Sequence, residues 1–198
     1  MTPIIKSIVI NKRKLGVTII IIGLMIVLLG LEKNFDMRLK FTALMQNNIK
    51  YLTQYEGMGN RLKYKLPSQW SSKNQDIFGS EILYHSDFKS EDNKINGFVE
   101  VWNLNGDLKT FLQNSKIISE KQNLYKNYYI SDIQINGNDG YLIQYTITKA
   151  VGDSYKGMEY FLKKGTKFCR FSFFVNESDF KENMPTIFET IVKTLEYK

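Results

Sequence analysis

The stretch Leu15–Leu31 reads LGVTIIIIGLMIVLLGL, and its 17 residues include no charged side chain. A helix of this length extends about 25 Å, slightly less than the hydrocarbon core of a bilayer. Continuation of the helix to Phe35 and a snorkelling Lys14 make up the difference. The stretch therefore predicts a membrane-spanning helix over residues 15–35. The alternative is a buried core helix, but uncharged runs this long normally span membranes.

The residues on either side of this stretch predict its orientation. Lys12, Arg13 and Lys14 adjoin its N-terminal end, whereas the basic residues after it are mixed with Glu32 and Asp36. Because cytoplasmic flanks carry the excess of lysine and arginine, we expect a cytoplasmic N-terminus and an extracellular C-terminal domain. A cleaved signal peptide needs an A-x-A-like site, and a lipoprotein signal needs a cysteine, where this sequence reads LLGLEKNFD. The sequence favours an uncleaved, single-pass anchor in the cell membrane.

The rest of the chain predicts one folded domain. We expect a short basic tail over residues 1–14, the anchor over 15–35, a helical stalk and linker over 36–60, and a globular domain over 61–198. A domain of that length buries about two thirds of its unfolded surface. The aromatic content of 14% argues against disorder. The net charge of +7 suits an acidic partner, but the lysines are scattered among acidic residues, which favours an ordinary solvated surface.

The hydrophobic periodicity after residue 35 changes between helical and strand-like. Alternating apolar positions, bounded by turn residues, predict strands over residues 61–66, 77–84, 95–102, 125–135, 141–149, 155–163 and 167–175. Apolar residues three and four apart predict helices over residues 36–55, 107–118 and 179–195. The turn residues at 136–140 and 164–166 predict two hairpins. Pro185 is expected either to kink the last helix or to restart it.

Several segments stand in an order that is similar to that of a known family. They are Leu66-Pro67-Ser68-Gln69-Trp70, Phe78–Tyr84, Gly97–Asn103, Asp107–Leu112, Gly140–Tyr145 and Phe188–Leu195. Their order resembles the PsbP superfamily over residues 61–198, in the membrane-anchored form found in Gram-positive bacteria. The resemblance implies an α+β fold, an antiparallel sheet sandwiched by helices. Photosynthetic function does not carry over, since a membrane anchor replaces the plastid transit peptide, and His85 is the only histidine.

The side chains with the most reactive chemistry also have structural explanations. Asp87 could orient His85 as a base, whereas Ser86 points to the opposite face of the strand. The alternative is an ordinary histidine at a strand end, and a single histidine excludes a multi-histidine metal site. Cys169 lies within a predicted strand, so we expect a buried thiol with Arg170 on the other face.

An acidic loop and a tyrosine-rich segment are weaker candidates. Asp87, Glu91, Asp92 and Glu100 could surround calcium, but their spacing does not match an EF-hand, and a solvated acidic turn is the alternative. The tyrosines at 125, 128 and 129 lie among lysines, where aromatic rings can stack on bases or sugars. Packing against the sheet explains at least half of them, since tyrosine favours strands.

The sequence predicts no catalytic, cofactor-binding or metal-binding residue. Motifs for phosphate loops, dinucleotides, serine hydrolases and zinc proteases are absent. We therefore expect a non-enzymatic, membrane-anchored accessory domain on the outer face of the cell membrane. Its expected contacts are the lipid bilayer, through residues 15–35, and a protein partner, but not nucleic acid. One alternative is an anchored module for cell-wall polymer or anionic surfaces, and another is a hydrolase or metal-dependent enzyme with an unrecognised site.

Overall fold

The structure, a computed structural model, describes residues 12–76, 80–104, 106–121, 125–148 and 154–198. The chain divides into two compact units, Met1–Thr42 and Ala43–Lys198. Helix α1, Lys12–Gln46, contains a segment long and apolar enough to cross a membrane. The apolar helix predicted over residues 15–35 is therefore confirmed as a helix. A signal sequence near the N-terminus has the same properties, so anchoring itself stays a prediction.

The helical prediction for residues 36–55 is wrong beyond Gln46. Helix α1 ends there, and Asn48 adopts a positive φ of 56°, a conformation that terminates helices. The chain then forms strand β1, Leu52–Gly57, which pairs with the next strand. Of residues 57–60, predicted as a linker, Gly57 ends β1 and the other three belong to the turn over 58–61 between these two strands. The compact unit thus includes a hairpin strand that the periodicity misassigned to a stalk.

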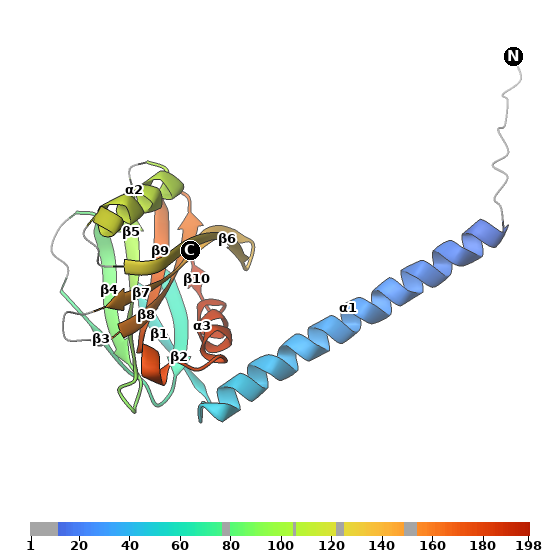
Figure 1. The fold of residues 1–198 in the computed structure, drawn as a ribbon, viewed down its shortest axis with the longest axis horizontal. Coiled ribbons are helices and arrows are strands. Elements are labelled where there is room, and N and C mark those ends of the chain that lie inside the picture. The colour runs from blue at the N-terminus through green and yellow to red at the C-terminus, as the bar shows by residue number, and fades with distance from the viewer. Residues whose placement is uncertain (1–11, 77–79, 105, 122–124, 149–153) are drawn as a thin grey trace, which may run out of the picture. The chain divides into compact units, whose positions relative to one another are not determined.

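The second unit contains two antiparallel sheets (Figure 1). The larger sheet has the strand order β3-β4-β5-β9-β8-β7-β6, and the smaller has the order β1-β2-β10. The remaining strands are β2 Leu62–Pro67, β3 Ser71–Asn74, β4 Ile82–Lys89, β5 Ile95–Asn103, β6 Tyr125–Ile135, β7 Asn138–Thr148, β8 Ser154–Lys164, β9 Lys167–Asn176 and β10 Glu196–Tyr197. The sequence predicted one antiparallel sheet, which is confirmed, and it did not predict the second, smaller sheet.

Both predicted hairpins are confirmed, and each turn is shorter than predicted, since Lys164 pairs with Lys167 and leaves two residues between β8 and β9. Strands β6 and β7 pair from Ile135 and Asn138 outward, so two residues, Asn136 and Gly137, make the turn. Their φ values of 52° and 74° are the left-handed values that such a turn requires. Strand β4 lies further along the chain than the predicted strand over 77–84, of which residues 77–79 lie outside the described residues.

Helix α2, Leu108–Lys121, covers one face of the larger sheet. It follows Asp107, whose carboxylate accepts from the Thr110 backbone N–H at 2.9 Å and so caps the first turn. The buried side chains Leu108 and Leu112 pack with Ile143 of the sheet. The predicted helix over 107–118 is confirmed, and its apolar stripe faces the sheet.

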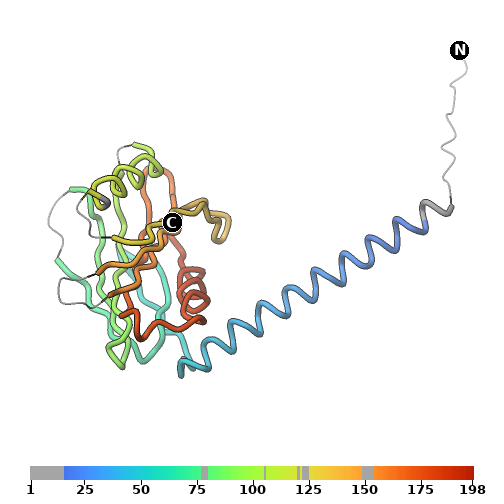
Figure 2. Tube along the Cα trace, viewed as in Figure 1, coloured from blue at the N-terminus to red at the C-terminus, as the bar shows by residue number. Residues whose placement is uncertain are grey.

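Helix α3, Met184–Val192, and the smaller sheet share the opposite face. The Phe188 ring stacks on Phe173 with 4.2 Å between centroids, and the Tyr64 ring meets Phe171 edge-on at 5.7 Å. The single helix predicted over 179–195 is shorter, because Pro185 lies in the first turn and restarts the helix after a 3-10 turn. Figure 2 shows α3 in dark red, after the orange strand β9. The α+β fold places helices on both faces of the larger sheet, as predicted.

Candidate functional site

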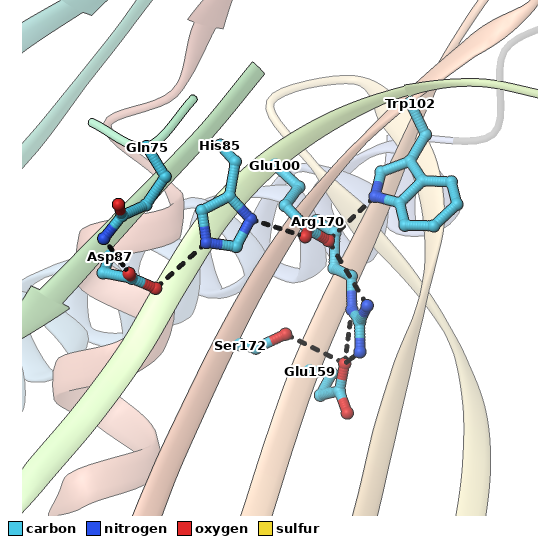
Figure 3. Close-up of polar contacts among 8 residues, drawn as sticks. All are labelled: Gln75, His85, Asp87, Glu100, Trp102, Glu159, Arg170 and Ser172. Atoms are coloured by element: carbon cyan, nitrogen blue, oxygen red, sulfur yellow. Dashed lines mark hydrogen bonds and ion pairs between the residues drawn. The ribbon is translucent and has the colours of Figure 1, made fainter. Parts of the chain in front are cut away.

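A row of polar side chains crosses the face of the larger sheet that α2 partly covers (Figure 3). His85 stands opposite Glu100 in the pairing of β4 with β5, and Glu100 stands opposite Arg170 in the pairing of β5 with β9. Residues directly opposite each other project from the same face, so these side chains meet. We call the charged members of the row the polar network: His85, Asp87, Glu100, Glu159 and Arg170.

His85 joins two carboxylates at one end of the polar network. Its Nδ1 lies 2.8 Å from Glu100 Oε1, and its Nε2 lies 3.0 Å from Asp87 Oδ1. Partial burial lowers the pKa of His85, but hydrogen bonds to Asp87 and Glu100 outweigh burial and raise the pKa above its ordinary value. Both ring nitrogens are engaged, so the arrangement suits a structural bridge better than a general base.

Arg170 pairs with both buried glutamates at the centre of the polar network. Its Nε donates to Glu159 Oε2 at 2.6 Å, its Nη2 lies 2.5 Å from the same oxygen, and its Nη1 donates to Glu100 at 3.3 Å. The guanidinium also lies over the rings of Phe98 and Phe161, at 4.8 and 5.4 Å. Burial lowers the pKa of Arg170, but the two carboxylates outweigh burial and raise it, so the positive charge is fixed.

Uncharged side chains donate further hydrogen bonds to the carboxylates of Glu100 and Glu159. Ser172 Oγ donates to Glu159 Oε2 at 2.9 Å, the Tyr145 hydroxyl donates to Glu159 Oε1, and Trp102 Nε1 donates to Glu100 Oε2 at 2.8 Å. Burial and the charge of Glu159 raise the pKa of Tyr145, so this phenol keeps its proton. Every carboxylate oxygen of these two buried residues therefore has a hydrogen-bonding partner, as buried charges require.

A cavity of about 100 Å³, which we call the α2 cavity, lies between α2 and the sheet beside Arg170 and Glu159. Its lining combines that charged pair with two serines of α2, two aliphatic side chains and seven aromatic rings. The lining residues are Trp102, Phe111, Leu112, Ser115, Ser119, Tyr125, Tyr128, Ile143, Tyr145, Glu159, Phe161, Phe168 and Arg170. Small-molecule sites combine aromatic walls with a few converging polar groups, as this cavity does, but they usually enclose about 300–1,000 Å³. The α2 cavity can therefore take only part of such a molecule.

The predicted acidic cluster converges only in part, because Asp87 and Glu100 both contact His85 but Asp92 does not. Glu100 belongs to the polar network, whereas Asp92 accepts from the Lys94 backbone N–H at 3.1 Å in the turn between β4 and β5. Over the described residues, no group of three or more histidine, cysteine, aspartate or glutamate side chains is placed to hold a metal ion. Ser86 points away from His85, as expected, and shares a hydrogen bond with Ser72 Oγ at 3.0 Å.

Two of the predicted tyrosines, Tyr125 and Tyr128, lie on the face of the sheet opposite the thiol. Cys169 is only 1% exposed, and burial raises its pKa to about 12, so it remains a protonated structural thiol. Tyr125 and Tyr128 pack against Tyr145, at 4.6 and 5.6 Å between ring centroids, and line the α2 cavity. Tyr129 projects into solvent with 63% of its surface exposed. The sheet-packing interpretation therefore holds for two of the three tyrosines.

Sequence reasoning missed the central pairs of the polar network. Each of the three central charged residues has a buried apolar residue directly before and directly after it in its strand. The flanking pairs are Val99 and Val101 for Glu100, Met158 and Tyr160 for Glu159, and Cys169 and Phe171 for Arg170. A charged residue at such a position in an otherwise apolar strand is the signal that was present. Buried carboxylates and guanidinium groups are rarely unpaired, so each of these residues calls for a partner on a neighbouring strand.

Comparison with known proteins shows the fold. No protein-family model matches the chain, and no curated protein matches it. The solution structure of cyanobacterial PsbP (CyanoP) from Synechocystis is similar, with a TM-score of 0.56 and 11% identity over 74% of this chain and 92% of that chain. A crystal structure from Bacteroides thetaiotaomicron has a TM-score of 0.51 and 15% identity over 73% of this chain and 48% of that chain. At such identities the likeness shows the fold alone. The chain therefore contains a PsbP-like α+β domain.

Proposed function

We propose that this protein is a single-pass membrane protein whose PsbP-like domain binds a partner at the outer face of the cell membrane. The observation that carries the proposal is the apolar surface of α1. Its most apolar window has a mean hydropathy of 2.2, and no part of that window is buried in the structure. Side chains such as Ile20 and Leu29 are each 64% exposed. An uninterrupted apolar surface of this length is stable in lipid rather than in water.

The outward orientation is supported by the sequence that precedes the apolar segment. Lys12, Arg13 and Lys14 stand together at that boundary, where a cytoplasmic flank is expected. To test the orientation, protease is added to intact cells that carry a C-terminal epitope tag on the full chain. Loss of the tag before lysis supports an outward domain. A tag that survives until the membrane is opened would place the domain in the cytoplasm and contradict the proposal.

The reactive side chains are either buried or already paired with other side chains, which supports binding rather than catalysis. Carboxylates engage both ring nitrogens of His85, and the Cys169 thiol is buried and protonated. Arg170 is compensated by the two glutamates that it contacts. These groups hold one another in place, and the α2 cavity beside them offers a binding site. A membrane anchor would add to this by raising the effective concentration of the domain near a partner in the same membrane.

A replacement experiment tests whether the anchor acts only by confinement. In a deletion strain, a chain whose residues 1–42 are replaced by an unrelated membrane helix of the same orientation should restore the wild-type phenotype. A secreted form of residues 43–198 at equal expression should not. The cut is made before Ala43, where the compact unit begins, because a cut before Arg61 would remove β1.

A full-length His85→Gln protein controls for catalysis in the same strain. This variant should retain function, since the proposal gives His85 no chemical role. Loss of function in a His85→Gln protein that still folds would favour the enzyme alternative.

A further inference from the structure

The α2 cavity has room for about four non-hydrogen atoms. Its volume is about 100 Å³, and an apolar cavity of about 150 Å³ holds benzene, which has six carbon atoms. A complete sugar ring or nucleobase is larger than this space. A side group of such a molecule fits.

The charges in the lining select an uncharged group. Glu159 accepts from Arg170, Ser172 and Tyr145, while Arg170 also donates to Glu100. A ligand with a unit charge would enter without a counter-ion and would lose its hydration. The cavity is instead dipolar, since one guanidinium and one carboxylate both line it. A neutral group with its own dipole matches this lining.

The unused hydrogen-bonding capacity defines that group further. Arginine has five N–H donors, and three of them go to Glu100 and Glu159 in the contacts described above. Among the described residues, the other two N–H groups of Arg170 have no hydrogen-bonding partner, so they remain for a ligand. Over the part of the chain that the structure describes, Glu159 Oε1 accepts from Tyr145 alone and has one lone pair left. The complementary group has one oxygen that accepts two hydrogen bonds and one N–H that donates a single bond.

An acetamido group meets each of these requirements. Its four non-hydrogen atoms are a methyl carbon, a carbonyl carbon, an oxygen and a nitrogen that carries one hydrogen. The methyl carbon would contact aromatic rings such as Phe111 and Phe168, which line the cavity. A primary carboxamide would bring a second N–H without an acceptor, and a carboxylate would bring a charge.

We propose that the α2 cavity binds the acetamido group of an N-acetylated amino sugar. The carbonyl oxygen accepts from Arg170, the N–H donates to Glu159, and the sugar ring stays outside the cavity. The choice of a sugar rests on the proposed outward orientation of the domain, because glycans that carry acetamido groups lie outside the cell membrane. The proposal therefore names the class of partner for the proposed binding function, an N-acetylated glycan. It also agrees with the alternative that the domain is an anchored module for cell-wall polymer.

Saturation-transfer NMR on the full-length chain tests the proposal. The protein is held in a polyoxyethylene detergent, which contains neither sugar nor amide, and the probes are N-acetylglucosamine, glucosamine, glucose and Nε-acetyl-lysine. We expect N-acetylglucosamine to bind at least about ten-fold more tightly than glucose or glucosamine, because a site built for an amide rejects analogues that leave its polar groups unpaired. Transfer should be strongest at the acetyl methyl protons. Equal affinity for glucose overturns the proposal, and tighter binding of Nε-acetyl-lysine overturns the choice of a sugar.

Two variants on α2 locate the binding site. Ser115 lines the α2 cavity and is exposed, so Ser115→Met fills the cavity from its outer side without touching the polar network. It should weaken binding of N-acetylglucosamine at least about ten-fold. Asn114→Met adds similar bulk at the adjacent exposed position, outside the lining, and should leave affinity within about two-fold. If Ser115→Met binds N-acetylglucosamine with unchanged affinity, the sugar does not bind in the α2 cavity and the proposal is overturned. Absence of sugar binding alongside a successful anchor replacement refutes this proposal and leaves the proposed function standing.

Discussion

Phe188→Ala tests whether α3 supports the larger sheet. Phe188 is fully buried, and its ring stacks on Phe173 at 4.2 Å with an interplanar angle of 8°. Removing a fully buried phenylalanine ring costs about 3–5 kcal/mol, through lost transfer energy and the cavity that remains. Stacked aromatic pairs contribute about 0.5–1.5 kcal/mol beyond area burial, which places the expected cost in the upper part of that range. Domains of ordinary stability unfold with about 5–15 kcal/mol, so the loss is a large fraction of the total.

Urea unfolding of residues 43–198 measures this cost. Trp70 belongs to the core under α3 and Trp102 contacts the core under α2, so tryptophan fluorescence reports on both faces of the sheet. Tyr129→Ala is the surface control, because that ring is 63% exposed, and its expected cost is below about 1 kcal/mol. A cost below about 1 kcal/mol for Phe188→Ala, at an unchanged dependence on urea, would show that α3 does not pack as described.

The remaining predictions concern pH and backbone packing. Because the folded pKa of His85 is raised, its protonated form stabilises the domain fully below the unfolded pKa of about 6.5, and this stabilisation is lost as the pH rises through the folded pKa. The stability difference between wild type and His85→Gln should therefore be larger near about pH 5 than near about pH 9 in urea titrations; a difference independent of pH would contradict the bridge to its carboxylates. Gly97→Ala should cost about 1–3 kcal/mol, because a Cβ there would lie 2.0 Å from the Ser172 carbonyl oxygen. A neutral Gly97→Ala variant would show that β5 and β9 do not approach each other so closely.

The elements that the sequence predicted well are those in which periodicity and turn chemistry agree. The β6–β7 hairpin combines alternating apolar residues with Asn136 and Gly137, which accept the positive φ of the turn. Strand β1 was missed because Leu52 and Tyr55 continue the three-residue spacing of α1, although both pack against the core from a strand. Strand β10 has two residues, too few for any periodic signal. Both β1 and β10 are strands because they pair with β2, a contact that local periodicity does not reveal.

The polar network shows a different limit of sequence reasoning. Glu100 and Arg170 are 70 positions apart in the chain, and their contact depends on the pairing of β5 with β9. The sequence indicates that each charge needs a partner but does not give the strand order that supplies it. The α2 cavity was less predictable still, because its shape depends on side chains from α2 and five strands packing together.

The alignment of β9 with its neighbours depends on charge more than on aromatic packing. Both faces of β9 carry phenylalanine: Phe168 belongs to the core under α2, and Phe171 belongs to the core under α3. A slip of one residue would exchange these faces, and the exchanged phenylalanines would still meet apolar neighbours. The same slip would move Arg170 into the core around Cys169, where an uncompensated guanidinium costs several kcal/mol. The slip would also leave the buried Glu100 and Glu159 without their cation. Misaligned sheets are therefore penalised at three charged residues at once, and the contacts of Arg170 fix the register of β9.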